Sequence, residues 1–348
     1  MRFTCSSVGH SEQLASTLSP SPCRIAQRYT ERVPDPITAI LEHQPFVLLD
    51  GALATELEAR GADLNDPLWS ARVLVDAPEL IHEVHASYFE AGADCATTAS
   101  YQASFEGFSR RGFSFEEAAG LMQRAVSLAL EARDAFWAHA EHRAGRAKPF
   151  VAASVGPYGA FLADGSEYSG DYGRTQAELE AFHAPRIAVL ADAGADILAF
   201  ETIPSALEAR ALMRVLEHHP HARAWLSFSA CDGTHICRGE AFKDCVLEFG
   251  THPQVVAIGV NCTAPQFITD LLKSARGLTS TPLLAYPNSG EAYDPISKTW
   301  GGKCSSTDFV AQAQSWLEAG ARVIGGCCRT TPAHIAAVRR ELLEVNAT

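Results

Sequence analysis

The sequence has no run approaching the roughly 18 consecutive apolar residues that a membrane-spanning helix needs. Basic residues are also scarce, because 28 Lys and Arg stand against 41 Asp and Glu, a formal charge of −13. Nonspecific nucleic-acid binding depends on clustered cations, so this balance argues against it. Residues 1–33 lack the continuous apolar stretch of a secretory signal peptide. We therefore expect a cytoplasmic protein with neither membrane nor nucleic-acid partners, and no obligate protein partner is evident.

Cysteine is present, but too sparsely for a disulfide scaffold. Ten cysteines in 348 residues are about 3%, whereas disulfide-stabilised small proteins exceed roughly 8%. In the reducing cytosol, cysteine acts instead as core filler, metal ligand or catalyst. The sequence therefore raises the question of which cysteines carry chemistry.

Residues 1–35 differ in composition from the rest of the chain. The first 33 residues hold six serines and four arginines against two glutamates, with little periodicity. This composition favours a disordered or loosely attached N-terminal extension. A short organellar presequence is the alternative interpretation, because the segment contains Arg and Ser and few acids. We assign residues 36–348 to one domain.

From Pro36 onwards, short apolar runs alternate with longer helical patterns. Eight runs are apolar nearly throughout, which is typical of strands buried on both faces of a parallel sheet. Eight strands, each followed by a helix, in about 310 residues predict an α/β fold with a single (β/α)8 TIM-type barrel. A doubly wound open sheet is the alternative, but no G-x-G-x-x-G motif follows the first run. The runs are 46–50, 93–99, 150–155, 196–201, 224–230, 255–262, 282–287 and 322–327.

Start and stop signals delimit the helices between these runs. Capping-box patterns, in which a polar side chain and a Glu three residues later satisfy free backbone N–H groups, begin at Asp76, Ser114 and Thr175. Thr331, which precedes a proline, is a further start signal. An Ala-Gly-Ala motif occurs three times between a helical pattern and the next run, and its glycine can adopt the left-handed conformation that ends a helix. These glycines are Gly92, Gly194 and Gly320.

Three cysteines lie at strand ends. In a (β/α)8 barrel the active site forms at the C-terminal ends of the strands. Cys262 ends the sixth apolar run, and Cys327 and Cys328 follow a pair of glycines at the end of the eighth. Three thiolates suit zinc and would leave its fourth coordination position open. The alternatives are core packing of adjacent cysteines or a vicinal Cys327–Cys328 disulfide.

Other possible metal ligands have weaker spacing. His82 and His85 are three residues apart rather than four as in H-E-x-x-H, so we interpret them as solvent-facing or capping side chains. Cys231, His235 and Cys237 could form a metal loop, with Cys231 as the replacement if one of the three zinc ligands is wrong. No partner pattern is visible for Cys5, Cys23, Cys95, Cys245 and Cys304.

A zinc ion bound by three thiolates favours one kind of reaction. Zinc lowers the pKa of a thiol, ordinarily about 8.5, so an incoming thiol is captured as the thiolate. The three cysteine thiolates and the incoming thiolate together carry more negative charge than the zinc ion carries positive charge. The complex is therefore a poor Lewis acid for carbonyls or water. Because the bound sulfur stays nucleophilic, these residues indicate thiol alkylation by in-line displacement.

The sequence resembles the homocysteine S-methyltransferase family in three motifs. They are Asp50–Ala52 after the first run, Gly259–Cys262, and Gly325–Pro332. The likeness covers about residues 36–344. Within the family the chain is similar to the S-methylmethionine-dependent branch in residues 48–61, 154–172 and 286–300.

The resemblance implies a barrel in which Cys262, Cys327 and Cys328 hold one Zn²⁺ and activate the substrate thiol. It also implies that Asp50 and Glu201 bind the amino group of homocysteine, a strong charge-assisted contact. The implied reaction transfers a methyl group from S-methylmethionine, or less well from S-adenosylmethionine, to the thiolate of L-homocysteine. The product is methionine, and selenium analogues of the acceptor are further candidates.

The identity of the methyl donor leaves alternatives open. A sulfonium or quaternary ammonium donor is cationic and leaves as a neutral molecule, so no general acid is needed. Aromatic side chains could receive such a cation by cation–π contact, although packing is the commoner role of any one of them. A betaine-dependent homocysteine methyltransferase is one alternative, and a non-catalytic zinc or redox protein that uses Cys327 and Cys328 is another. The aromatic candidates are Tyr101, Tyr158, Tyr168 and Trp300.

Overall fold

The computed structural model describes residues 35–62, 70–290, 292–294, 299–301 and 305–344. Apart from Asp35, the predicted N-terminal extension lies outside this part of the chain, so the division at residue 36 stays a prediction. None of the helices in the described ranges has the length and hydrophobicity that a membrane span requires.

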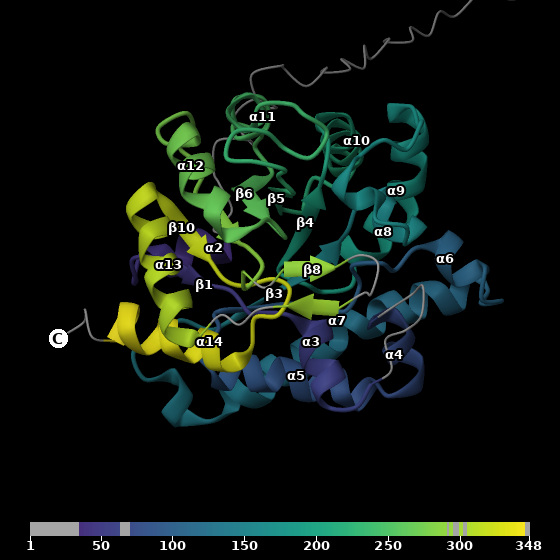
Figure 1. Ribbon diagram of the computed structural model, residues 1–348. Coiled ribbons are helices and arrows are strands. Elements are labelled where there is room, and N and C mark those ends of the chain that lie inside the picture. Colours follow the sequence, from purple (N-terminus) through teal and green to yellow (C-terminus); the bar gives the residue numbers. More distant parts are fainter. Residues whose placement is uncertain (1–34, 63–69, 291, 295–298, 302–304, 345–348) are drawn as a thin grey trace, which may run out of the picture. The chain divides into compact units, whose positions relative to one another are not determined.

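Eight parallel strands form one sheet, in the order β1-β10-β7-β6-β5-β4-β3-β2 (Figure 1). Each of the eight predicted runs contains or overlaps one of these strands, which confirms the predicted (β/α)8 barrel and excludes the open doubly wound alternative. The strands are β1 (Val47–Leu48), β2 (Cys95–Thr97), β3 (Phe150–Val155), β4 (Ile197–Ile203), β5 (Ala224–Phe228), β6 (Val255–Asn261), β7 (Leu283–Tyr286) and β10 (Ala321–Ile324).

The two edges of this sheet, β1 and β2, are joined largely by carboxylates. The Asp94 N–H donates to the Leu48 carbonyl at 2.6 Å, and the Asp94 carboxylate accepts from the Leu48 N–H at 3.0 Å. Further along the seam, Asp50 accepts from the Thr97 N–H at 2.7 Å. In a continuous ladder the Thr97 N–H would pair with a backbone carbonyl, but here it pairs with the Asp50 carboxylate. This contact fixes the Asp50 side chain between β1 and β2.

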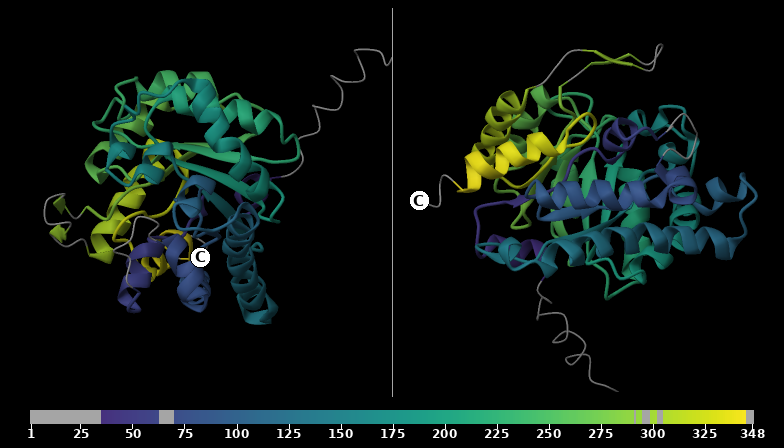
Figure 2. Two further views of the ribbon diagram at one scale, coloured as in Figure 1. Left: turned by 90° about the vertical axis from the view of Figure 1, so that its right-hand side faces the viewer. Right: turned by 90° about the horizontal axis from the view of Figure 1, so that it is seen from below.

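Helices follow the strands and surround the sheet, with α5 and α7 side by side (Figure 2). They are α3 (Leu53–Ala59), α4 (Ser70–Asp76) and α5 (Pro78–Glu90) after β1; α6 (Phe105–Ser109) and α7 (Phe115–Ala138) after β2; α8 (Tyr158–Leu162) and α9 (Gln176–Ala191) after β3; α10 (Ala206–Glu217) after β4; α11 (Phe242–Phe249) after β5; α12 (Pro265–Ala275) after β6; α13 (Ser306–Ala319) after β7; and α14 (Pro332–Val338) after β10. Shorter turns of helix are η1 (Ala140–Arg143), η2 (Ser166–Tyr168) and η3 (Arg339–Glu344).

Side chains of successive strand residues alternate between the barrel interior and the surrounding helices. On β4, Ile197 and Ala199 pack in one apolar cluster with residues of the other strands. Leu198 and Phe200 instead pack in the cluster that contains most of the buried helix residues. Because both faces are buried, the strands read as continuous apolar runs rather than as an alternating pattern.

Two elements lie outside the repeating strand–helix pattern. Helix α2 (Pro36–Leu41) precedes β1, and its Ile37 and Ile40 are part of the interior cluster. After β7, strands β8 (Ala292–Asp294) and β9 (Thr299–Gly301) pair antiparallel in a hairpin. The sequence reasoning did not predict this hairpin, which stands away from the barrel in both views of Figure 2.

Most of the predicted helix boundaries are confirmed. Ser114, Thr175 and Thr331 each form a capping box at the start of a helix, and the three Ala-Gly-Ala glycines all have positive φ. The capping box predicted at Asp76 is wrong, because Asp76 ends α4 and the N-cap of α5 is Ala77, which makes no side-chain cap. The proline at the start of α5 has no N–H to be capped.

A Gly259→Ala substitution is expected to destabilise the barrel by about 3 kcal/mol or more, because the core leaves no room for a methyl group. A Cβ at residue 259 would overlap the carbonyl of Leu284, its partner on β7. The matched control is Gly120→Ala in α7, where no atom lies within 4 Å of the new methyl group. That control is expected to stabilise the helix by up to about 1 kcal/mol. Urea unfolding of both variants measures the difference, and equal effects would contradict the packing argument.

Candidate active site

The apolar interior of the barrel ends in a polar layer at the C-terminal ends of the strands. On five of the six strands from β2 to β7, the residue two positions before this layer belongs to the apolar interior cluster, as Ala199 does on β4. By the period of two, the next inward position on each of these six strands is polar. Parallel strands bring these ends together, so the layer forms one surface. Its members are Thr97, Ser154, Glu201, Ser227, Asn261 and Tyr286.

Glu201 is held on β4 by hydroxyl groups from two other strands. The Ser154 hydroxyl donates to Oε1, and the Tyr286 hydroxyl donates to Oε2 at 3.0 Å. Tyr286 is itself oriented by Trp225, whose Nε1–H donates to the phenol oxygen at 3.1 Å. The side chain is buried, and burial raises the pKa of Glu201 to about 7, although both hydroxyl donors act against this rise.

Asp50 lies across the site from Glu201, after β1. Its two carboxylate oxygens accept from the N–H and the hydroxyl of Thr97, at 2.7 and 2.9 Å. Burial raises the pKa of Asp50 to about 7 against these two hydrogen bonds, and the charge of Glu201 adds to the rise. In the described part of the chain, no basic side chain pairs with either acid. Both carboxylates are therefore available to a bound cation.

Backbone strain gathers at the same strand ends. Among the described residues, four non-glycine residues have positive φ, and three of them lie at this end of the barrel: Thr202 (61°) near the C-terminal end of β4, Cys262 (45°) directly after β6, and Arg329 (67°) after β10. Such angles are uncommon, and for a β-branched residue they are outliers. Asn261 stabilises the turn at Thr202, because its Oδ1 accepts from the Thr202 N–H at 2.7 Å and its Nδ2 donates to the hydroxyl at 2.8 Å. Strain of this kind is concentrated at functional sites in many proteins.

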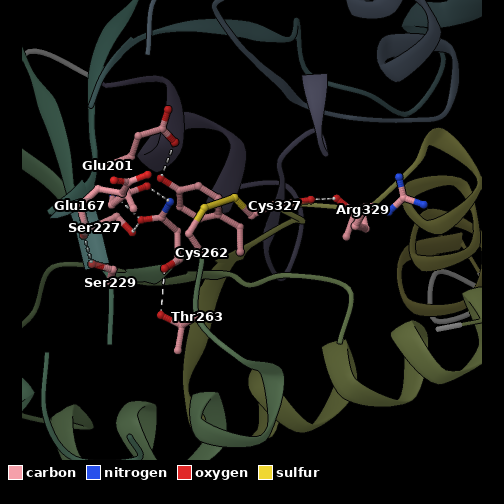
Figure 3. Close-up of a disulfide and its surroundings, with 12 residues drawn as sticks. Glu167, Glu201, Ser227, Ser229, Cys262, Thr263, Cys327 and Arg329 are labelled. Carbon is pink, nitrogen blue, oxygen red and sulfur yellow. Dashed lines mark hydrogen bonds between the residues drawn. A yellow bond between two sulfur atoms is a disulfide. The ribbon is translucent and has the colours of Figure 1, made fainter. Parts of the chain in front are cut away.

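The sulfur atoms of Cys262, Cys327 and Cys328 lie within 4.8 Å of one another. In the ranges that the structure describes, this is the one group of three or more Cys, His, Asp or Glu residues found close enough to hold a metal ion. Cys262 and Cys327 form a disulfide, with Cα atoms 5.6 Å apart, and Cys328 is a free thiol (Figure 3). The predicted alternative of a vicinal Cys327–Cys328 disulfide is therefore wrong for this structure.

The chain turns sharply to bring Cys327 and Cys328 to the site. Gly326 has no space for a Cβ, which would overlap the side chain of Thr330. The Thr330 hydroxyl donates to the Cys327 carbonyl at 2.6 Å, and the Cys327 N–H donates to the Pro287 carbonyl at 2.8 Å. The glycine at residue 326 thus lets the chain turn tightly against the residue that follows β7.

The three sulfurs fit a zinc ion once the disulfide is reduced. Zinc binds thiolate sulfur at about 2.3 Å in a tetrahedral site, so sulfurs on one ion lie roughly 3.8 Å apart, and the three sulfurs already lie within 4.8 Å of one another. Burial raises the pKa of the Cys328 thiol to about 11, and the charges of Glu167 and Glu201 act in the same direction. Without a cation the thiol is therefore protonated at neutral pH, whereas a bound metal favours the thiolate.

A family model described as homocysteine S-methyltransferase matches residues 47–342, which is nearly the whole described chain. The chain belongs to the homocysteine S-methyltransferase family. The family match excludes the alternative of a non-catalytic zinc or redox protein, and the chain is a methyltransferase.

Individual members of the homocysteine S-methyltransferase family are similar over almost their entire length. The homocysteine S-methyltransferase YbgG of Bacillus subtilis is 54% identical over 301 residues, 86% of this chain and 96% of the relative. The structure resembles the metallated form of the homocysteine methyltransferase MmuM of Escherichia coli, with a TM-score of 0.79 and 48% identity over 88% of this chain and 99% of the other. An oxidised form of the same enzyme is similar with a TM-score of 0.80, the same identity and the same coverage.

The remaining predicted metal ligands do not come together. Cys231, His235 and Cys237 belong to no close group of possible ligands in the described residues. His235 is hydrogen-bonded through Nδ1 to the carboxylate of Asp232, at 3.0 Å to Oδ2. Cys95 and Cys245 are buried in the apolar core. Cys5, Cys23 and Cys304 lie outside the described residues.

The interpretation of His82 and His85 as solvent-facing or capping side chains is wrong for His85. This side chain is fully buried on α5, and neither ring nitrogen has a hydrogen-bond partner. Burial lowers the pKa of His85 to about 3, so the ring is neutral. Ile81, Val84, His85 and Tyr88 are buried together, and their spacing is that of one helix face. The sequence therefore carried the signal that this histidine faces the core.

The four aromatic candidates for donor binding differ in their surroundings. Tyr158 packs against Phe161, Tyr172 and Phe182 in a separate buried cluster, so packing accounts for it. Tyr168 is 46% exposed. Tyr101 lies near the site, because the charges of Glu167 and Glu201 contribute to raising the pKa of its phenol, although burial is the largest cause. The side chain of Trp300 lies outside the described part of the chain.

The sequence did not predict a supporting role for the polar residues that hold the two acids, although Thr97 and Tyr286 stand at strand ends where an active site is expected. Ser154, Thr97 and Tyr286 each lie inside one of the predicted apolar runs, close to the C-terminal end. A polar side chain there lies in the layer where barrel active sites form. The position of a polar residue near the C-terminal end of an apolar run was therefore the signal that could have identified these three residues.

Proposed function

We propose that this enzyme transfers a methyl group from a cationic donor, S-methylmethionine in the first place, to the thiol of L-homocysteine, and so forms methionine. The observation that carries the proposal is the pairing of two chemically different parts in one site. Three cysteine sulfurs lie within 4.8 Å of one another, and two buried carboxylates without cationic partners share the same end of the barrel. A thiol and an ammonium group are the two functional groups of homocysteine that such a site recognises.

Asp50 and Glu201 would bind the ammonium group of homocysteine. Each is buried with a raised pKa, so the charged form of each is disfavoured until a cation arrives. The ammonium group supplies that cation and holds both carboxylates in the ionised state. Thr97 and Tyr286 keep the acceptor oxygens oriented, so the amino acid is fixed in one position relative to the cysteines.

Cys262, Cys327 and Cys328 would hold zinc when all three are reduced. Bound zinc lowers the pKa of a thiol ligand, and this keeps the homocysteine sulfur as a nucleophilic thiolate at neutral pH. Reduction of the Cys262–Cys327 disulfide is then a condition for activity. The same zinc site would also bind a selenol. A relative that is 47% identical is the selenocysteine Se-methyltransferase of Brassica oleracea.

The electron balance of the transfer explains why no general acid is needed. The carbon–sulfur bond of the sulfonium breaks as the new bond to the thiolate sulfur forms. The positive and negative charges cancel, and both products are neutral thioethers at the reacting sulfur. With S-methylmethionine, donor and acceptor each become methionine, so two methionines form per homocysteine consumed.

The donor is tested by initial rates with S-methylmethionine, S-adenosylmethionine and betaine at saturating homocysteine. The reduced, zinc-loaded protein is expected to use S-methylmethionine fastest and S-adenosylmethionine more slowly, with two methionines per homocysteine for the first donor. Faster turnover with betaine would overturn the donor assignment and leave the acceptor assignment intact. Absence of methionine with all three donors would overturn the proposed function.

A further inference from the structure

One acidic side chain near the proposed active site has a buried oxygen without a hydrogen-bond partner. Glu167 lies in η2, and its Oε2 is buried and accepts no hydrogen bond. In the residues that the structure describes, it forms no ion pair. Burial raises the pKa of Glu167, to which the charge of Asp164 contributes. A buried carboxylate oxygen without a donor is costly, so it calls for an explanation.

Helix α8 holds the backbone at Glu167 in place. A Cβ at Gly159 would overlap the Glu167 nitrogen, so α8 and η2 are in direct contact at this glycine. Helix α8 is itself anchored, because the Tyr158 N–H donates to Oε1 of the buried Glu208 at 2.6 Å. The position of Glu167 is therefore part of the packed structure rather than that of a freely moving loop.

A second contact holds the loop on the side of β5. The Ser229 hydroxyl donates to the Glu167 carbonyl at 3.3 Å. Within the loop, the Ser166 N–H donates to Oδ1 of Asp164 at 3.0 Å, and Gly165 has a φ of 85° that favours glycine. These contacts fix the direction in which the Glu167 side chain leaves the backbone.

Glu167 faces the same space as the proposed acceptor site. Its charge acts on the Cys328 thiol together with that of Glu201, and on the Tyr101 phenol. Figure 3 shows Glu167 and Glu201 on one side of the sulfur pair and Arg329 on the other. An ionisable carboxylate thus lies beside the cysteines without being engaged by the hydrogen bonds that orient Glu201 and Asp50.

We propose that the Glu167 carboxylate receives the positive charge of the methyl donor and thereby selects a sulfonium donor. This inference rests on the proposed function. With S-methylmethionine the reaction brings three positive groups to the site, namely the ammonium of homocysteine and the sulfonium and ammonium of the donor. The first is accounted for by Asp50 and Glu201. The sulfonium is the one that must lie at the reacting centre beside the cysteines, where Oε2 of Glu167 has no hydrogen-bond partner. When the methyl group leaves, the donor sulfur becomes neutral, and the same carboxylate ceases to bind it, which favours product release.

The test compares Glu167→Gln with the unchanged enzyme, reduced and zinc-loaded, in steady-state kinetics. The KM for S-methylmethionine at saturating homocysteine is expected to rise about 10- to 100-fold, the range for a lost contact to a charged group. The KM for homocysteine is expected to stay unchanged. Tetramethylammonium, a permanent cation that lacks amino and carboxyl groups, is expected to compete with the donor and to lose affinity by a similar factor. Glu167→Asp keeps the charge and is expected to recover part of the loss.

Asp164→Asn is the matched control. It removes one charge from the same loop and keeps an oxygen that accepts from the Ser166 N–H, so both KM values are expected to stay unchanged. Equal changes in both KM values of Glu167→Gln, or a fall in kcat alone, would show a structural role and overturn the inference. An unchanged tetramethylammonium affinity would also overturn it, because Glu167 would then bind another part of the donor. If the unchanged enzyme makes no methionine, the proposed function itself fails.

Discussion

Cys328→Ser is expected to lose both zinc binding and methyl transfer while the barrel stays folded. The hydroxyl of serine is similar in size to the thiol but does not ionise at neutral pH, so one of three anionic ligands is removed. Loss of a residue that merely supports a metal ligand costs about 10- to 100-fold in affinity or activity. Loss of a ligand is expected to exceed that range. Metal analysis of the reduced protein, and the rate of methionine formation from S-methylmethionine, measure the two effects.

The experiment needs a control cysteine outside the cluster, and it needs the disulfide within the cluster to be reduced. Cys231→Ser is the matched control, because Cys231 is exposed and belongs to no close group of possible ligands among the described residues. It is expected to keep near-stoichiometric zinc and full activity. Each protein must be reduced before zinc is added, since the Cys262–Cys327 disulfide removes two of the three thiolates. A Cys328→Ser variant that retains zinc and activity would exclude the proposed ligand set.

The sequence predicted the barrel because its strands are buried on both faces. The predicted run 150–155 coincides with β3, and the other predicted runs contain or overlap the remaining strands of the sheet. Continuous apolar runs and short helix-to-strand turns are local signals, and both are written in consecutive residues. The β8–β9 hairpin was missed because it interrupts the repeating pattern between β7 and α13 and is not part of the barrel sheet.

The site could be predicted only as far as its strand ends. Placing Cys262, Cys327 and Cys328 at the C-terminal mouth required only the barrel topology, and the roles of Asp50 and Glu201 came from the family resemblance. Contacts between strands that are distant in the sequence could not be predicted. Tyr286 donates to Glu201 across 85 residues of sequence, and the register that aligns two such strands is not encoded in either segment alone. The disulfide between Cys262 and Cys327 was missed for the same reason.

Asp50→Asn is expected to raise the KM for homocysteine by about 30-fold or more, because loss of one partner of a buried charge pair costs about 2–5 kcal/mol. The substitution suits the site, since the asparagine oxygen can accept from the Thr97 N–H and its amide can donate to the Thr97 hydroxyl. The hydrogen-bonded seam between β1 and β2 is therefore retained, and only the charge is removed. Steady-state kinetics at varied homocysteine, with saturating donor, measure the change.

The pH dependence gives a second readout of the same charge. Burial raises the pKa values of Asp50 and Glu201 to about 7 in the free enzyme. As the pH falls below about 7, both acids take up protons, so kcat/KM for homocysteine is expected to decrease. Because the two acids interact, the profile reports the pair rather than either residue. Asp50→Asn removes one of the two ionisations, so its profile is expected to be shallower on the acid side.

Folding stability is expected to change in the opposite direction to binding. An acid whose pKa is raised by folding stabilises the folded state most below its unfolded pKa, and this contribution is lost as the pH rises through its folded pKa. At pH 8 the ionised Asp50 therefore opposes folding, and Asp50→Asn is expected to raise Tm. Asp308→Asn is the contrast, because hydrogen bonds from Ser305 lower the pKa of that exposed acid, and its Tm is expected not to rise. An Asp50→Asn variant with unchanged KM would refute the ammonium-binding role. A variant that is more stable but binds homocysteine poorly would mean that the charge at residue 50 serves the ligand at the expense of the fold.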